Sequence, residues 1–409
     1  MLNALRLLPL LTVLTALAVG FWTISHLDAG IGDEDVHRFQ INWFIEGRYE
    51  IFQYVTMVPL YHWLVATLAE LSGLTSLQGL RLVHTALAAT AIPAFYLLSR
   101  RLYPECAAPR TLQFLFIPLL FPLFFVTYTD LPALTVTLLM LERVVARHYA
   151  WAAVFALLAV VMRQPNIAWV GFALALIACQ LAQDHGRGML ALDNLHSAAR
   201  RGWLLLLVVF AFGAFVLWNG GVAMGDVEQH PLSLNLSNLY FCLLVAWALF
   251  LPFNVEQLGN IGRLLAERKW IWAALIVAFV VYFFTYTATH KYNSPALDFY
   301  RHNLLIHYTV DFTLGRILAF ILIAWMVLSF VTAANASVYP REMLLLAPFA
   351  VLSFLPMPLI EPRYYIVALC LFLALRPPMS RAATVATLAY YVPASAWILY
   401  NISRQNFFI

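Results

Sequence analysis

The sequence predicts an all-α protein that crosses a membrane many times. Of its 409 residues, 63% are hydrophobic and only 11% are charged, and the mean hydropathy is +0.81. Apolar runs recur from one end of the chain to the other, each near the roughly 20 residues that a helix needs to span a bilayer. No hydrophilic stretch is long enough to fold as a separate soluble domain. We therefore expect one integral-membrane domain over residues 1–409.

About 13 of the apolar runs are predicted to be membrane-spanning helices. In chain order they are 5–25, 80–99, 111–128, 131–146, 150–162, 166–183, 203–219, 236–252, 270–289, 315–335, 342–356, 364–376 and 382–400. The first lacks a small-residue cleavage site, so it is predicted to be a retained anchor. The run 59–71 is too short and too interrupted for a span. We expect interfacial helices there, within a first non-cytoplasmic loop over 26–79.

The distribution of charged residues supports this membrane topology and argues against binding of nucleic acid. With 59–71 outside the bilayer core, arginine and lysine are more numerous on the side of the N-terminus, which the positive-inside rule makes cytoplasmic. Counting 59–71 as a span would move Arg100, Arg101 and Arg110 to the other side. The net charge of +4 is dispersed and gives no footprint for nucleic acid. The four cysteines are scattered, which predicts neither a disulfide framework nor a metal site.

The non-cytoplasmic face collects most of the acids, histidines and asparagines. They lie in GDEDVH (32–37), TD (129–130), RQPN (163–166), NGG (219–221), GDVEQH (225–230), HKYN (290–293) and EPRYY (361–365). The cytoplasmic loops, in contrast, are short connectors flanked by arginine. Random loop composition does not sort residues in this way, so the sorting predicts a functional site on that face.

The acidic run 32–37 is the most informative of these groups. It places three carboxylates and an imidazole at the mouth of a membrane protein, where each acid must be solvated or paired. Such a cluster suits proton abstraction or cation binding. A plain solvated loop is the alternative.

The other groups also have two interpretations each. Asp130 opens a predicted helix, where an acid is favoured by the helix N-terminus alone. Arg163 can bind a phosphate bidentately or extend to the lipid headgroups. The pair His290-Lys291 can bind an anion or anchor a helix end at the interface, and Arg363 can pair with Glu361.

Taken together, the carboxylates and cations fit lipid-linked glycosyl transfer. A polyprenyl-phosphate sugar presents its phosphate at the edge of the bilayer while its tail lies in the hydrocarbon. Cations there would hold the phosphate leaving group, and a carboxylate would deprotonate the acceptor hydroxyl.

Five stretches in order along the chain resemble one family. They are DEDVHRFQINWFIEGRYE (33–50), MRQPNIAWV (162–170), WNGGVAMGDVEQH (218–230), TYTATHKYN (285–293) and EPRYYIV (361–367). These motifs are similar to those of the dolichyl-phosphate-glucose-dependent alpha-1,2-glucosyltransferases, which add the last glucose to the lipid-linked oligosaccharide for asparagine glycosylation. The resemblance implies a helical bundle of the GT-C type.

The resemblance also implies the chemistry and its residues. Glucose moves with inversion from a polyprenyl phosphate to a lipid-linked oligosaccharide, without a nucleotide sugar, cofactor or metal. Asp33 is the first choice for the general base and Glu34 the second, with His37 orienting the acid or the acceptor. The expected donor-phosphate ligands are Arg163, His290, Lys291 and Arg363, and the expected acceptor-side residues are Asp130, Gln164, Asn166, Asp226 and His230.

Three departures from the family pattern keep other functions open. Val36 stands where the family has Phe, Pro165 replaces Thr, and Thr289 replaces Ala. A GT-C enzyme with a different sugar acceptor therefore remains an alternative. A transporter of a solute or a lipid-linked sugar is a second alternative, because transporters also have about a dozen helices. The site is expected to face an endoplasmic-reticulum lumen in a eukaryote and a periplasm in a bacterium.

Overall fold

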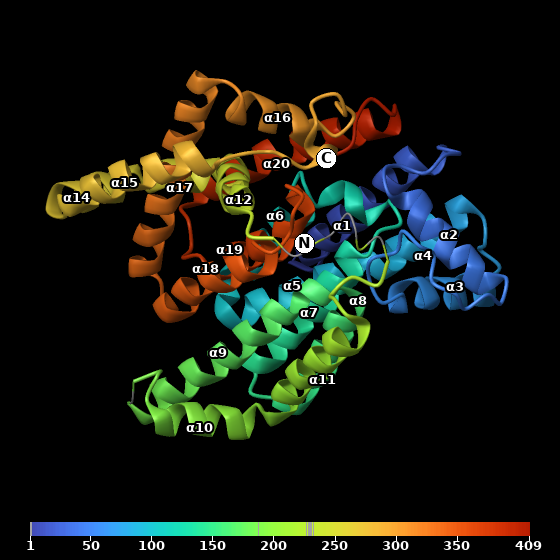
Figure 1. Ribbon diagram of the computed structural model, residues 1–409, viewed down its shortest axis with the longest axis horizontal. Coiled ribbons are helices and arrows are strands. Elements are labelled where there is room, and N and C mark those ends of the chain that lie inside the picture. The colour runs from blue at the N-terminus through green and yellow to red at the C-terminus, as the bar shows by residue number, and fades with distance from the viewer. Residues whose placement is uncertain (1, 187, 226, 228–230, 232) are drawn as a thin grey trace. The chain divides into compact units, whose positions relative to one another are not determined.

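The protein is helical throughout the part that the computed structural model describes, which is residues 2–186, 188–225, 227, 231 and 233–409 (Figure 1). No β-strand occurs among these residues, and the only bridge pairs Tyr300 with Phe408. The chain divides into two compact units, Met1–Leu115 with Leu120–His230 and Phe116–Leu119 with Pro231–Ile409. Two compact units can belong to one domain or to two, so the single domain over 1–409 stays a prediction.

Unit 1 contains the first eleven α-helices of the described residues. They are α1 (Leu2–Ser25), α2 (Glu34–Ile45), α3 (Leu60–Ser72), α4 (Leu77–Ala89), α5 (Ala91–Leu102), α6 (Ala107–Leu115), α7 (Asp130–Val145), α8 (Tyr149–Met162), α9 (Ile167–His185), α10 (Leu192–Arg201) and α11 (Trp203–Asn219). Helix α7 packs against α5 and α8, and α2 lies beside α3 (Figure 1). The α2–α3 pair is joined by Ile41, Tyr61 and Val65, which are all buried.

Unit 2 contains the remaining nine α-helices of the described chain. They are α12 (Leu236–Leu249), α13 (Leu251–Glu256), α14 (Leu258–Glu267), α15 (Trp270–Thr285), α16 (Arg301–Val310), α17 (Thr313–Ala336), α18 (Pro340–Phe354), α19 (Ile366–Leu375) and α20 (Arg381–Ser403). Helix α17 packs against α12, α14 to α16 and α18. Short 3-10 turns, Lys291–Asn293 and Pro362–Tyr365, carry two of the predicted motifs.

Most predicted spans are confirmed as helices, but the count of about 13 crossings is not confirmed. Four helices of the described residues are long and apolar enough to cross a membrane, or five if α10 and α11 form one broken span. Shorter apolar helices such as α8 and α15 account for further predicted runs. The expected helix over 59–71 is present as α3.

The predicted continuous span 111–128 is wrong. Helix α6 ends at Leu115, and only the 3-10 turn Phe121–Phe124 follows before α7. The reason is proline, because Pro118 and Pro122 cannot supply the N–H groups that a continuous helix requires. Pro252 likewise lies at the start of α13, so the predicted span 236–252 divides at Phe250.

Candidate functional site: an acidic loop in unit 1 and a cationic loop in unit 2

A buried ion pair fixes the acidic loop of unit 1. The Arg81 guanidinium binds the Glu34 carboxylate with both Nε and Nη2, at 3.0 and 2.7 Å, and neither side chain is exposed. Glu34 also accepts the backbone N–H groups of Ile31 at 3.1 Å and Thr127 at 2.9 Å. Arg81 further donates to three backbone carbonyls of the segment 24–29. With its oxygens occupied in this way, Glu34 ties the loop to α4 and to the segment before α7.

The same loop holds Asp33 at the start of α2. Gly32 has a φ of +57°, a left-handed conformation that glycine adopts without strain. The Asp33 N–H donates to the Tyr128 hydroxyl at 2.6 Å, and that hydroxyl donates to the Ile31 carbonyl at 2.9 Å. The backbone of Asp33 is therefore fixed, while its side chain is only partly buried.

His37 pairs with a second histidine that sequence reasoning missed. The ring atoms His37 Nδ1 and His62 Nε2 are 2.9 Å apart, and both side chains are buried. Burial holds the pKa of His62 well below its usual value of 6.5, and a charge on His37 would lower that pKa further. His62 is therefore a neutral hydrogen-bond partner for His37. No motif marks it, because its role depends on the packing of α3 against α2.

Stability should decrease as the pH falls, in part through His62. In the unfolded chain His62 takes up a proton near pH 6.5, whereas in the folded protein it stays neutral to a lower pH, so acid favours the unfolded state. The slope from one such group is at most about 1.4 kcal/mol per pH unit. His62→Gln should reduce the loss of Tm between pH 7 and 5. Exposed His196→Gln is the control, and an equal pH slope in both variants would contradict the assignment.

A second ion pair joins the predicted residues Asp130 and Arg163. Their side chains are in direct contact, and Asp130 is almost fully buried. The other carboxylate oxygen of Asp130, Oδ2, is buried and has no hydrogen-bond partner among the described residues. Both Asp130 and Glu34 lie close enough to Tyr61 to raise its pKa, which burial already holds well above 10.0. Asp130 therefore belongs to the same buried cluster as the acidic loop.

The next two predicted residues have structural contacts. The Gln164 amide donates to the carbonyls of Thr56 at 3.3 Å and Val222 at 3.2 Å, and so joins the first loop to the NGG segment. The Asn166 amide donates to the Ala159 carbonyl at 3.0 Å, and so attaches the turn between α8 and α9 to the end of α8. These contacts position the loops of unit 1.

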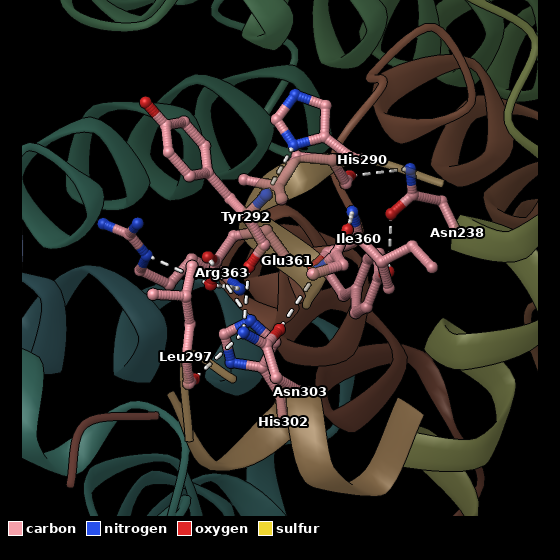
Figure 2. A network of polar contacts seen from close by, with 12 residues as sticks. Asn238, His290, Tyr292, Leu297, His302, Asn303, Ile360, Glu361 and Arg363 are labelled. Carbon is pink, nitrogen blue, oxygen red and sulfur yellow. Dashed lines mark hydrogen bonds and ion pairs between the residues drawn. The ribbon is translucent and has the colours of Figure 1, made fainter. Parts of the chain in front are cut away.

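An asparagine network organises the cationic loop of unit 2 (Figure 2). Asn293 and the backbone of Ile360 exchange two hydrogen bonds, of 2.8 and 2.9 Å. Asn303 donates to the carbonyls of Tyr292, Ser294 and Leu297. Asn238 on α12 donates to the carbonyls of Met357 and Leu359, at 2.9 and 3.0 Å. These amides attach the HKYN turn to the segment that leads into EPRYY.

The network joins the two segments that carry the predicted cations of unit 2. The Arg363 Nε donates to Glu361 at 3.2 Å, which confirms the pairing considered from the sequence. His302, which no motif marks, lies 3.9 Å from Glu361, and burial lowers its pKa below 6.5. His290 Nδ1 accepts the Tyr292 N–H at 3.3 Å, so the His290 proton lies on Nε2. Lys291 is exposed, and its amine lies 5.0 Å from the Tyr292 ring.

Two predicted acceptor-side residues, Asp226 and His230, lie outside the described residues. Within the described ranges, no group of three or more His, Cys, Asp or Glu side chains is arranged to hold a metal ion.

Comparison with protein families gives one match over most of the chain. The model of the family described as "DIE2/ALG10 family" matches residues 28–194 and 186–374.

Individual relatives carry one common name, Dol-P-Glc:Glc(2)Man(9)GlcNAc(2)-PP-Dol alpha-1,2-glucosyltransferase. The Debaryomyces hansenii protein is 24% identical over 65% of this chain and 63% of its own length. The Drosophila melanogaster protein is 24% identical over 70% of both chains, and the Rattus norvegicus protein 23% over 92% of this chain and 90% of its own. This chain thus spans less than two thirds of the Debaryomyces protein. Among solved structures, apo ArnT from Cupriavidus metallidurans is 16% identical over 98% of this chain and 78% of its own, with a TM-score of 0.45.

Proposed function

Because the chain belongs to the DIE2/ALG10 family, we propose that it is an inverting glycosyltransferase acting at a membrane. It moves glucose from a polyprenyl (dolichyl) phosphate to a lipid-linked oligosaccharide and forms an alpha-1,2 linkage. The names of its relatives support this donor, acceptor and linkage. The observation that carries the proposal is the acidic loop, in which Glu34 and Arg81 hold a partly buried Asp33 at a fixed position.

In the proposed reaction, Asp33 is the general base. Its carboxylate takes the proton from the acceptor hydroxyl, whose oxygen attacks the anomeric carbon of glucose. The bond from that carbon to the phosphate oxygen breaks, and polyprenyl phosphate leaves. Attack opposite the leaving group converts a β-linked donor into an α-linked product. His37, held by His62, orients the acid or the acceptor.

The four occupied contacts of Glu34 assign it a different role from Asp33. Its two oxygens already accept two guanidinium and two backbone N–H groups, and the side chain is fully buried, so it is not accessible to an acceptor hydroxyl. Glu34 is therefore proposed to support the loop, and Asp33 to perform the chemistry. Arg163 in turn is paired with Asp130. Asp130 is proposed to shape the acceptor side, and Arg163 stays a proposed ligand of the donor phosphate.

In unit 2, His290, Lys291 and Arg363 are proposed to bind the donor phosphate. The His290 Nε2–H, the Lys291 amine and the Arg363 guanidinium are all donors to phosphate oxygens, and the positive charges of Lys291 and Arg363 stabilise the leaving group. An apolar cavity of about 300 Å³ in the same unit is lined mostly by residues of α12, α17, α18 and α19. A cavity of this kind suits the apolar tail of an amphipathic donor.

The finer membrane description is part of the same proposal. We propose a GT-C bundle of about 13 crossings, of which the four or five long helices and the five shorter apolar helices of the described residues would supply nine or ten. The site would face the endoplasmic-reticulum lumen in a eukaryote and the periplasm in a bacterium. The reaction as proposed uses neither a metal nor a nucleotide sugar.

The proposal is tested by purifying the protein and supplying polyprenyl-phosphate [14C]glucose with a lipid-linked oligosaccharide. Transfer of label to the oligosaccharide supports the enzyme. In sealed vesicles, movement of intact lipid-linked sugar without any new glycosidic bond would instead indicate a transporter.

Lys291→Met should weaken binding of the donor. Removing one charged contact to phosphate costs about 1.5–3 kcal/mol, so the KM for the lipid-phosphate donor should rise by about tenfold or more. The KM for the acceptor should not change. Lys269→Met is the matched control, because Lys269 is also exposed but precedes α15, away from the HKYN turn. Equal donor KM values in the two variants would remove Lys291 from the site.

A further inference from the structure

Helix α10 carries a surface that the proposed reaction does not use. It runs from Leu192 to Arg201 and is attached to α9 along one face. On that face Asn194 is buried, and its amide donates to the carbonyls of Ala178 at 3.0 Å and Met189 at 2.9 Å. Gly202 completes the contact, because a Cβ there would lie 2.8 Å from Leu174. The orientation of α10 is therefore fixed by its contacts with α9.

The faces of α10 that do not contact α9 expose leucine. Leu192 is 84% exposed and Leu195 is 40% exposed, and at a spacing of three residues they share one face. Leu190 just before the helix and Trp203 just after it are exposed as well. In water these apolar side chains would be unfavourable, at roughly 25 cal/mol for each Å² left uncovered. A cover of low polarity is therefore expected over this face.

The angle between α10 and α11 indicates what supplies that cover. The two helices are bent by 81° at Gly202. Helix α11 has no charged residue, and exposes Phe210, Leu217 and Trp218 among others, as a helix in contact with lipid does. If α11 crosses the bilayer, a bend of 81° places α10 almost parallel to the membrane surface.

Charge on α10 suits the headgroup region of a bilayer. Asp193 lies in the first turn, and Arg200 and Arg201 in the last turn are both exposed, at the bend into α11. An arginine near a helix C-terminus also stabilises the helix itself. Two adjacent arginines beside exposed leucines are, in addition, the pattern of an interfacial helix that binds anionic lipid.

We propose that α10 lies in the membrane interface, with Leu192 and Leu195 in the acyl region and Arg200 and Arg201 on anionic headgroups. The partner is thus a lipid leaflet of negative charge. This placement fixes the depth in the membrane of the bend between α10 and α11. It does not depend on the identity of the reaction.

The test uses the full chain in nanodiscs with an environment-sensitive dye on Leu195→Cys. Asp193→Cys is the matched control, because Asp193 is exposed and lies about 200° round the helix from Leu195. Parent protein treated with the same dye corrects for labelling of the native cysteines. The dye at 195 should emit as in an apolar medium and be quenched by lipids with brominated acyl chains, severalfold more than the dye at 193.

Charge dependence is measured in the same samples. In discs of phosphatidylcholine with phosphatidylglycerol, the dye at 195 should be less accessible to an aqueous quencher than in phosphatidylcholine alone. Arg200→Gln with Arg201→Gln should abolish that difference, as should 1 M salt, where the Debye length is about 3 Å.

Three results would overturn the proposal. The first is water-like emission at 195 in all discs. The second is the same protection in charged and neutral discs, which removes the anionic partner. The third is apolar emission only when two copies share a disc, which shows that a second copy covers α10.

Discussion

Asp33→Asn should reduce the turnover number for glucose transfer by about 10²–10⁴-fold, the usual contribution of a general base. The amide cannot accept the proton of the acceptor hydroxyl. The fold should be unaffected, because the loop is held through the backbone of Asp33 and through Glu34. The measurement is the initial rate with a labelled lipid-phosphate donor, together with Tm in the same detergent.

The control for this variant lies two residues away. Asp35→Asn makes the same chemical change at a partly exposed carboxylate that pairs with Arg38 at 2.9 Å. It should retain transfer. If Asp33→Asn kept the wild-type rate, or Asp35→Asn lost as much, Asp33 would not be the base.

Glu34→Gln should act on folding first. It leaves the fully buried Arg81 without a countercharge, and breaking a buried ion pair from one side costs about 3–5 kcal/mol. We expect a large decrease in Tm and in the yield of folded protein. The measurement is thermal unfolding at a pH near 7.

The double variant Glu34→Leu with Arg81→Met separates this structural role from a catalytic one. Removing both charges should recover part of the lost Tm, since no charge is then buried alone. A Glu34→Gln protein with a wild-type Tm and no transfer activity would show that Glu34, and not Asp33, is the base.

The positions of the helices could be predicted from the sequence better than the number of membrane crossings. The run 203–219 became α11 with the same bounds. In a bilayer, a helix is the structure in which one apolar segment of that length satisfies its own backbone hydrogen bonds. The run 111–128 failed because hydropathy alone overlooks Pro118 and Pro122. Helices of mixed composition, such as α14 and α16, were not predicted, since their apolar faces depend on packing against α17.

The candidate site could be predicted only in part, for a related reason. The motifs correctly indicated which segments hold polar clusters. They did not reveal that Glu34 pairs with Arg81, which lies 47 positions away in the chain. His62 and His302 carry no motif signal at all, because they act through neighbours brought close by folding. Roles that depend on a partner distant in the chain require the structure.

Linkage analysis of the product tests the central claim most directly. Purified protein is given β-linked polyprenyl-phosphate [14C]glucose or a labelled nucleotide sugar, each with the same lipid-linked oligosaccharide. Inverting transfer predicts label from the lipid-phosphate donor alone, in a terminal glucose that an α-glucosidase releases and that methylation analysis places on a 2-hydroxyl. A β-linked product, or transfer from the nucleotide sugar only, would contradict it.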